Sequence, residues 1–236
     1  MTKITLFNEW SKIINADNSL DKIKAREMYD ALIIEYSSES REHHNTKHIE
    51  HVLNKLNELF TIYTFTQRDM NACIMAGFYH DVVYNPVKPD TLIIPDEYQS
   101  AEYAERSMRI IGFSEDFIND VKLLIMLTEM HAVNEDITID TLVQKVFIDS
   151  DMAILGEDPF LYNQYSDGVI EEYKDIDHET FILGRKNFLT KLSKHKTIFF
   201  TEYMNHLYND QAHANIETEI KKMNSMYVEL LTKTEV

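Results

Sequence analysis

The stretch Phe78-Tyr79-His80-Asp81-Val82-Val83-Tyr84 closes an apolar run that begins at Cys73, and it sets a histidine directly beside an aspartate. Neighbouring side chains on a helix point about 100° apart, so this pair reaches a common point only if an ion lies between the two side chains. Divalent metals accept such a mixed set of nitrogen and oxygen ligands. We expect a helix over residues 68–84 that ends at the His-Asp pair, and a metal site at its end.

Other candidate ligands lie on both sides of this pair in the sequence. His44 and His48 are four residues apart, so on a helix they share one face. Asp149 and Asp151 interrupt the otherwise apolar segment 147–156. Burying an unpaired carboxylate is costly, so this acidic pair requires a cation, a cluster of donors or solvent.

The order of these elements resembles the HD superfamily of metal-dependent phosphohydrolases. It is most similar to a bacterial group whose pattern runs R-x-Y-H-N-x-x-H, F-x-H-D-x-x-Y, N-E-x-x-S-A, T-x-x-H, D-x-D-L-x-x-L-G, E-Y and G-R. The chain carries these elements in the same order over about residues 30–200, as Arg41 to His48, Phe78 to Tyr84, Asp96 to Ala101, Thr128 to His131, Asp149 to Gly156, Glu172-Tyr173 and Gly184-Arg185. It departs from the pattern at His43, Asp96 and Met152, where the group has Tyr, Asn and Leu, and none of these changes removes a ligand.

The resemblance implies a ligand set for one divalent ion, namely His48, His80, Asp81 and Asp151. Such a donor set leaves Mn, Fe, Ni, Co, Zn and Mg open. Asp149 is the alternative to Asp151, or else an acceptor that orients a ligand histidine. His131 lies on the helix expected over residues 114–131. There it binds a second metal or a substrate phosphate, or it satisfies the last carbonyls of the helix.

The resemblance also implies catalytic and substrate-binding residues. In the cyclic-nucleotide phosphodiesterases, which are distant HD relatives, the first histidine of Y-H-N-x-x-H donates a proton to the leaving oxygen. This makes His44 a candidate general acid, since an imidazole gives up a proton near neutral pH; the alternative is that it caps or packs within its own helix. Arg41 and Arg185 are candidates for binding phosphate through two parallel donors, or for ion pairs with acidic side chains. Tyr84 and Glu97 either line the site or have a structural role.

Composition favours an all-α fold, because the 236 residues include only 5 Gly and 4 Pro. We expect a single HD-type helical domain over residues 1–236, with its core at about 30–200 and additional N- and C-terminal helices. Three prolines predict an inserted loop over residues 85–96, which is either a lid or specificity element or an insertion without a role. Residues 198–236 predict a C-terminal helical segment.

Charge and cysteine content restrict the partners and the compartment. A net charge of −17 and a pI near 4.9 argue against binding long nucleic acid, whose phosphates need lysine and arginine. A small phosphorylated molecule or nucleotide remains possible, because a metal neutralises its charge locally. A single cysteine, Cys73, indicates a reducing cytoplasm. The sequence has neither a signal pattern nor an apolar run of about 18 residues, so we expect no membrane span.

These features together predict a metal-dependent phosphohydrolase that acts on a small phosphoester or nucleotide through metal-activated water, with Asp81 taking the proton of that water. One alternative is a non-catalytic HD module that uses the metal site to bind a nucleotide. Another is a structural helical protein whose polar core is a remnant of such a site. The sequence leaves the oligomeric state open.

Overall fold

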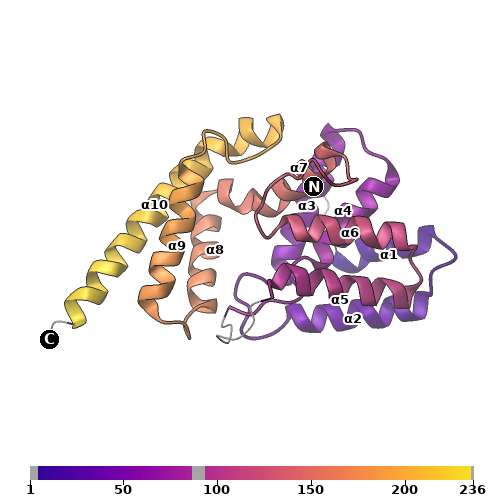
Figure 1. Ribbon diagram of the computed structural model, residues 1–236, viewed down its shortest axis with the longest axis horizontal. Coiled ribbons are helices and arrows are strands. Elements are labelled where there is room, and N and C mark those ends of the chain that lie inside the picture. Colours follow the sequence, from indigo (N-terminus) through magenta and orange to yellow (C-terminus); the bar gives the residue numbers. More distant parts are fainter. Residues whose placement is uncertain (1–4, 87–93, 235–236) are drawn as a thin grey trace. The chain divides into compact units, whose positions relative to one another are not determined.

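The computed structural model describes residues 5–86 and 94–234, and within these ranges every regular element is a helix (Figure 1). The helices are α1 (Leu6–Ala16), α2 (Lys22–Tyr36), α3 (Thr46–Ile62), α4 (Gln67–Tyr79), α5 (Asp96–Ile111), α6 (Glu115–Leu127), α7 (Thr141–Met152), the 3₁₀ helix η1 (Ala153–Gly156), α8 (Pro159–Glu172), α9 (His178–Ser193) and α10 (Glu202–Thr234). The predicted all-α fold class is therefore confirmed. In the part of the chain that the structure describes, no helix has the length and apolar character needed to cross a membrane.

The chain divides into two compact units, one that runs through Asp151 and one that starts at Met152. The expectation of a single HD-type domain over the whole chain stays a prediction. The loop expected at residues 85–96 belongs to the first unit, and its residues 87–93 lie outside the described residues.

Helix α4 is the central element of the first unit, and it contacts α1, α3, α5 and α6. Its start is fixed by a capping box, in which Thr66 and Asp69 satisfy each other's backbone N–H groups. All residues from Ala72 to Tyr79 are buried. A helix that is apolar on every side is stable only when other helices surround it, which explains the central position of α4.

Gly77 allows α3 to pack closely against α4. A Cβ atom at this position would lie 3.0 Å from Leu53 Cδ2 and 3.5 Å from Val52 Cγ1, so a larger residue would push the two helices apart. His48 lies one turn before Val52, and His80 lies one turn after Gly77. The close helix contact thus places the two histidines on facing surfaces.

The helix predicted over residues 68–84 ends earlier, at Tyr79, with His80 as its C-cap. Val82 N–H donates to the Tyr79 carbonyl 3.1 Å away, which closes a turn after the helix. Asp81 therefore lies in this turn, and its expected position on the helix is wrong. Apart from this bond, the peptide groups of Asp81, Val82 and Val83 bond to side chains of other elements, so the helical ladder does not continue.

The second unit is built around α10, which contacts η1, α8 and α9. Gly156 of η1 lies against the backbone of Tyr208, where even a Cβ atom would come within 2.7 Å of the Tyr208 carbonyl oxygen. A buried polar network joins Arg185 of α9, Glu219 of α10 and two tyrosines of α8, Tyr162 and Tyr165.

Candidate metal centre

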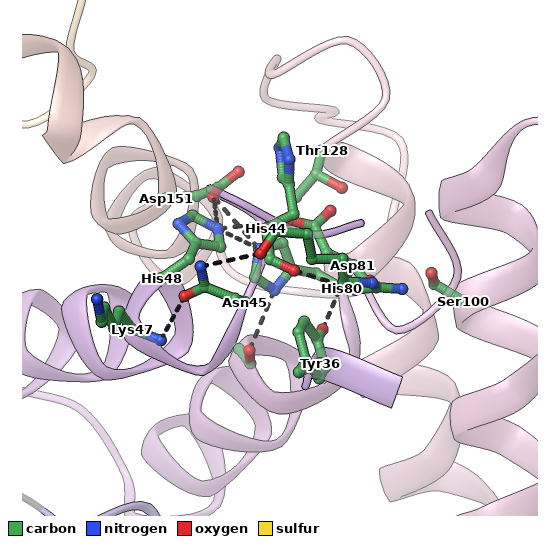
Figure 2. Close-up of polar contacts among 12 residues, drawn as sticks. Tyr36, His44, Asn45, Lys47, His48, His80, Asp81, Ser100, Thr128 and Asp151 are labelled. Carbon is green, nitrogen blue, oxygen red and sulfur yellow. Dashed lines mark hydrogen bonds and ion pairs between the residues drawn. The ribbon is translucent and has the colours of Figure 1, made fainter. Parts of the chain in front are cut away.

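His48 is placed by the start of α3. Asn45 is the N-cap of this helix, and its side chain accepts from Lys47 N–H at 2.9 Å. His48 lies in the first helical turn, and its side chain is buried. Its ring presents Nε2 to the residues that follow α4 (Figure 2).

His80 is held by the end of α4. Its Nδ1 lies 3.1 Å from the Gly77 carbonyl oxygen, so Nδ1–H donates to this oxygen and Nε2 is the ring nitrogen that faces the two carboxylates. The residue is 1% exposed. This hydrogen bond leaves Nε2 free to act as a ligand atom, as a metal-binding histidine requires.

Two carboxylates meet the two imidazole rings. His48 Nε2 lies 3.0 Å from His80 Nε2, 3.4 Å from Asp81 Oδ2 and 3.2 Å from Asp151 Oδ1. His80 Nε2 lies 3.1 Å from the same Asp81 oxygen and 3.3 Å from the same Asp151 oxygen. We call these four residues the central cluster; Figure 2 shows their side chains pointing toward one another.

These distances fit a divalent ion. An ion about 2.0–2.2 Å from each ligand atom separates neighbouring ligands by about 2.8–3.1 Å at right angles and about 3.3–3.6 Å at tetrahedral angles. The distance between the two imidazole nitrogens and the four distances from them to the carboxylate oxygens, 3.0–3.4 Å, lie within the span of about 2.8–3.6 Å that the two geometries cover together. Two imidazole nitrogens and two carboxylate oxygens are also a donor set that first-row divalent metals accept.

Electrostatics favour positive charge at the same point. Burial raises the pKa of the Asp81 and Asp151 carboxyls, but the nearby imidazoles of His80 and His48 outweigh it and hold both pKa values well below the usual range. Burial likewise lowers the pKa of His48 and His80, and the two carboxylates reverse that effect and raise both pKa values. The carboxylates therefore stay ionised inside the protein, beside imidazoles whose positive charge compensates them.

Of the two aspartates on α7, Asp151 faces the histidines. Its ligand oxygen lies with the Nε2 atoms of His48 and His80 in one group whose members are all within 4.8 Å of one another. Asp149 is fully buried. His80 Nδ1 donates to the Gly77 carbonyl, and His48 Nδ1 has no hydrogen-bond partner among the described residues. The orienting role suggested for Asp149 from the sequence stays a prediction.

His131 reaches the central cluster from a loop. The helix expected over residues 114–131 ends at Leu127, with Thr128 as its C-cap, so the expected helical position of His131 is wrong. His131 has a φ of 47°, in the left-handed region that non-glycine residues seldom adopt. This turn brings its Nε2 within 3.2 Å of Asp151 Oδ2, the oxygen that the other two histidines do not use.

His44 lies beside the central cluster, in the segment before α3. It precedes the N-cap Asn45, so it does not share a helical face with His48 as the spacing predicted. Its ring stacks on Tyr84, with centroids 4.0 Å apart, and its centroid lies 5.8 Å from that of His48. The ring of His43, for which we predicted no role, lies closer to that of His48, with the two centroids 4.8 Å apart.

The two candidate phosphate-binding arginines make other contacts. Arg41 donates to the backbone carbonyls of Asp81 and Val82, at 2.7 and 2.8 Å. Arg185 lies in the second unit and pairs with Glu219 at 2.9 Å, which is the ion-pair alternative. Both guanidinium groups thus contact protein oxygens, and the phosphate-binding role assigned to them from the sequence stays a prediction.

The other two candidate substrate-binding residues lie on different elements. Tyr84 follows the turn that contains Asp81, and its ring is the partner of His44. Glu97 is half-buried in the first turn of α5. The roles assigned to Tyr84 and Glu97 from the sequence stay predictions.

Comparison with solved structures identifies similar folds. The phosphodiesterase domain of the rhodopsin phosphodiesterase from Salpingoeca rosetta matches over 98% of this chain and 88% of its own, with a TM-score of 0.54 and 14% sequence identity. A second structure, the phosphodiesterase domain of the RhoPDE fusion protein from the same choanoflagellate, matches over 96% and 90%, with a TM-score of 0.56 and 14% identity. No protein-family model and no curated protein sequence matches the chain. The chain therefore has the fold of these phosphodiesterase domains, which confirms at the level of fold the relationship that the sequence predicted.

Proposed function

We propose that this protein is a metal-dependent phosphohydrolase that acts on a small phosphoester or nucleotide. The observation that carries the proposal is the central cluster, in which the Nε2 atoms of His48 and His80 lie 3.0 Å apart and each lies 3.1–3.4 Å from one oxygen of Asp81 and one oxygen of Asp151 in the protein interior. The similarity of fold to phosphodiesterase domains supports it.

His48, His80, Asp81 and Asp151 would hold the ion. Bound there, a divalent metal supplies Lewis-acid activation of water and of a phosphoryl oxygen. Asp81 suits the role of proton acceptor, because its side chain is 20% exposed, against 1–10% for the other three residues. Water attacks the phosphorus atom, its proton passes to the Asp81 carboxylate, and the bond from phosphorus to the leaving oxygen breaks.

The leaving oxygen needs a proton, and we assign its donation to His44. The stacked ring of Tyr84 fixes the plane of the imidazole beside the central cluster. His131 is the second candidate proton donor or phosphate ligand, because its ring is one-third exposed while Nε2 contacts Asp151. We expect the substrate phosphate to be bound by the metal and these histidines, since Arg41 and Arg185 already donate to protein oxygens.

The experiment combines elemental analysis with a substrate panel. Purified protein loaded with Mn²⁺ is incubated with nucleotides and phosphoesters, and the released phosphate or nucleoside is measured. His80→Ala and Asp151→Asn should lose both bound metal and hydrolysis, whereas His195→Ala and Asp116→Asn, which alter exposed residues, should keep both.

The outcomes separate the functional classes. Hydrolysis that disappears together with the metal supports the enzyme. Metal and nucleotide binding without product would indicate the non-catalytic binding module instead. Metal-dependent hydrolysis retained in both His80→Ala and Asp151→Asn would contradict the proposed site.

A further inference from the structure

The turn formed by Asp81, Val82 and Val83, which we call the Asp81 turn, has few backbone partners. Peptide groups that follow a helix end lose the regular ladder and need other partners when they are not in water. Val82 N–H donates to Tyr79, as described above. The remaining hydrogen bonds of the turn come from side chains on α2, on the segment after α2 and on α5.

Asp81 is held from both sides of its backbone. Its N–H donates to Tyr36 Oη at 3.1 Å, and its carbonyl accepts from Arg41 Nη1 at 2.7 Å. The second terminal nitrogen of Arg41, Nη2, donates to the Val82 carbonyl at 2.8 Å. Tyr36, the last residue of α2, is fully buried, so its hydroxyl is a fixed point for the turn (Figure 2).

The same guanidinium also reaches the segment that carries the candidate general acid. Arg41 Nη1 donates to the His44 carbonyl at 3.2 Å. The guanidinium carbon lies 4.9 Å from the ring centroid of Tyr36 and 5.8 Å from that of Tyr84. One side chain therefore links the backbone of Asp81 to the backbone of His44.

Val83 is fixed from α5 by a fully buried serine. Ser100 Oγ accepts from Val83 N–H at 3.1 Å and lies 3.2 Å from the Val83 carbonyl, to which it donates. Two residues later, Asn85 N–H donates to Asp96 Oδ2 at 2.9 Å. The sequence pattern includes the positions of Arg41, Ser100 and Asp96, the last of which is Asn in the bacterial group. In the structure all three side chains contact this stretch of backbone.

We propose that Arg41, together with Tyr36 and Ser100, is a positioning clamp that holds the Asp81 turn so that the Asp81 carboxylate meets the Nε2 atoms of His48 and His80. The inference rests on the proposed function, in which Asp81 is a metal ligand. Arginine suits this role because its planar fork serves two carbonyls at once, whereas lysine offers a single charged point. A ligand on a turn needs such support, because metal binding depends on placing ligand atoms to within about 0.5 Å.

The test uses Arg41→Lys, with Arg26→Lys as the matched control. Arg26 is an exposed arginine of α2 that pairs with Asp30 at 2.8 Å on the surface. Mn²⁺ affinity is measured by the electron paramagnetic resonance signal of the free ion, and hydrogen exchange is measured on peptides that cover residues 80–84. Loss of a residue that orients a metal ligand lowers metal affinity by about 10–100-fold, so we expect a loss of this size in Arg41→Lys and none in Arg26→Lys.

Hydrogen exchange decides how Arg41 acts. In Arg41→Lys without metal, the amides of the Asp81 turn should exchange faster, while those of α6 keep their wild-type rates. Tyr36→Phe removes only the hydroxyl that accepts from Asp81, so it gives the same test if Arg41→Lys does not fold. Unchanged Mn²⁺ affinity would overturn the clamp, and so would weaker affinity with an unchanged exchange rate in the turn.

The two proposals fail in different ways. A wild-type protein that binds no Mn²⁺ would overturn the proposed function, and the clamp would then be judged by exchange alone. Faster hydrogen exchange of the amides in the Asp81 turn of Arg41→Lys would show that the clamp supports this turn. An exchange rate equal to that of the wild type would overturn it.

Discussion

Removing the charge of Arg185 should destabilise the second unit strongly. Arg185 Nε lies 2.9 Å from Glu219 Oε1, and Nη2 lies 3.3 Å from Oε2, with side-chain exposures of 10% and 1%. Arg185→Met leaves the Glu219 carboxylate buried without its cation, and breaking a buried pair in this way costs about 3–5 kcal/mol. For a protein of this length the loss corresponds to a fall in Tm of about 6–20 °C.

A double-mutant cycle gives the size of the interaction. Arg185→Met with Glu219→Leu removes both charges but leaves the buried Tyr162 hydroxyl without its carboxylate partner, at a cost of about 1–3 kcal/mol. We therefore expect the two substitutions to be strongly non-additive, with the double variant much more stable than the sum of the single effects predicts. The assay is urea unfolding followed by far-ultraviolet circular dichroism.

The effect of pH follows from the pKa of Glu219. Burial raises this pKa, but the charge of Arg185 outweighs the burial and lowers it below its ordinary value of 4.5. The carboxylate therefore stabilises the folded state fully above about pH 4.5, and this contribution is lost as the pH falls through the lowered pKa. The stability difference between wild type and Glu219→Gln should shrink over the same range.

Two results would refute this reasoning. A loss below about 1 kcal/mol in Arg185→Met is the value for an exposed ion pair, and it would mean that the contact contributes little. A difference between wild type and Glu219→Gln that persists unchanged at low pH would mean that the Glu219 charge is not its source.

Three further predictions concern other elements. Gly156→Ala should lower the free energy of unfolding, measured in urea, by about 2–3 kcal/mol or more, because the new Cβ would lie 2.5 Å from Tyr208 Cβ. Gly184→Ala lies in the middle of α9 with no atom within 4 Å of the new Cβ, so it should raise the free energy of unfolding by about 0.5–1 kcal/mol. Equal effects would contradict this. Thr66→Ala removes the capping box of α4 and should cost about 1 kcal/mol by the same assay, and an unchanged stability would show that the cap contributes nothing. His44→Asn should lower kcat about 10²–10⁴-fold for an alkyl phosphate but much less for a nitrophenyl phosphate, whose leaving group needs no proton; equal losses would exclude the general acid.

The sequence was sufficient to predict the fold class and the residues that meet in the central cluster. Few helix breakers and apolar periodicity indicate an all-α protein, because both reflect local backbone preferences and burial. The resemblance to the HD superfamily implied that His48, His80 and Asp151 meet, and the structure brings them together. Their role as metal ligands stays a prediction.

Two features near the cluster depend on contacts that the sequence does not show. The predicted helices ran past the observed ends of α4 and α6. After His80 the backbone bonds to Tyr36 and Ser100 on distant elements. At His131 the backbone takes a left-handed conformation. The contacts of Arg41 with the backbone after His80 were not predicted either. A guanidinium that binds two carbonyls and one that binds a phosphate need the same residue, so only the surrounding atoms distinguish them.

The most direct test of the central claim is a crystal structure of the protein soaked with Mn²⁺, measured with anomalous scattering. We predict an anomalous peak bonded to Nε2 of His48 and His80 and to carboxylate oxygens of Asp81 and Asp151, at distances of about 2.0–2.3 Å. A map with no peak among these four side chains, or with ordered Mn²⁺ only elsewhere on the chain, would contradict the assignment of a metal centre.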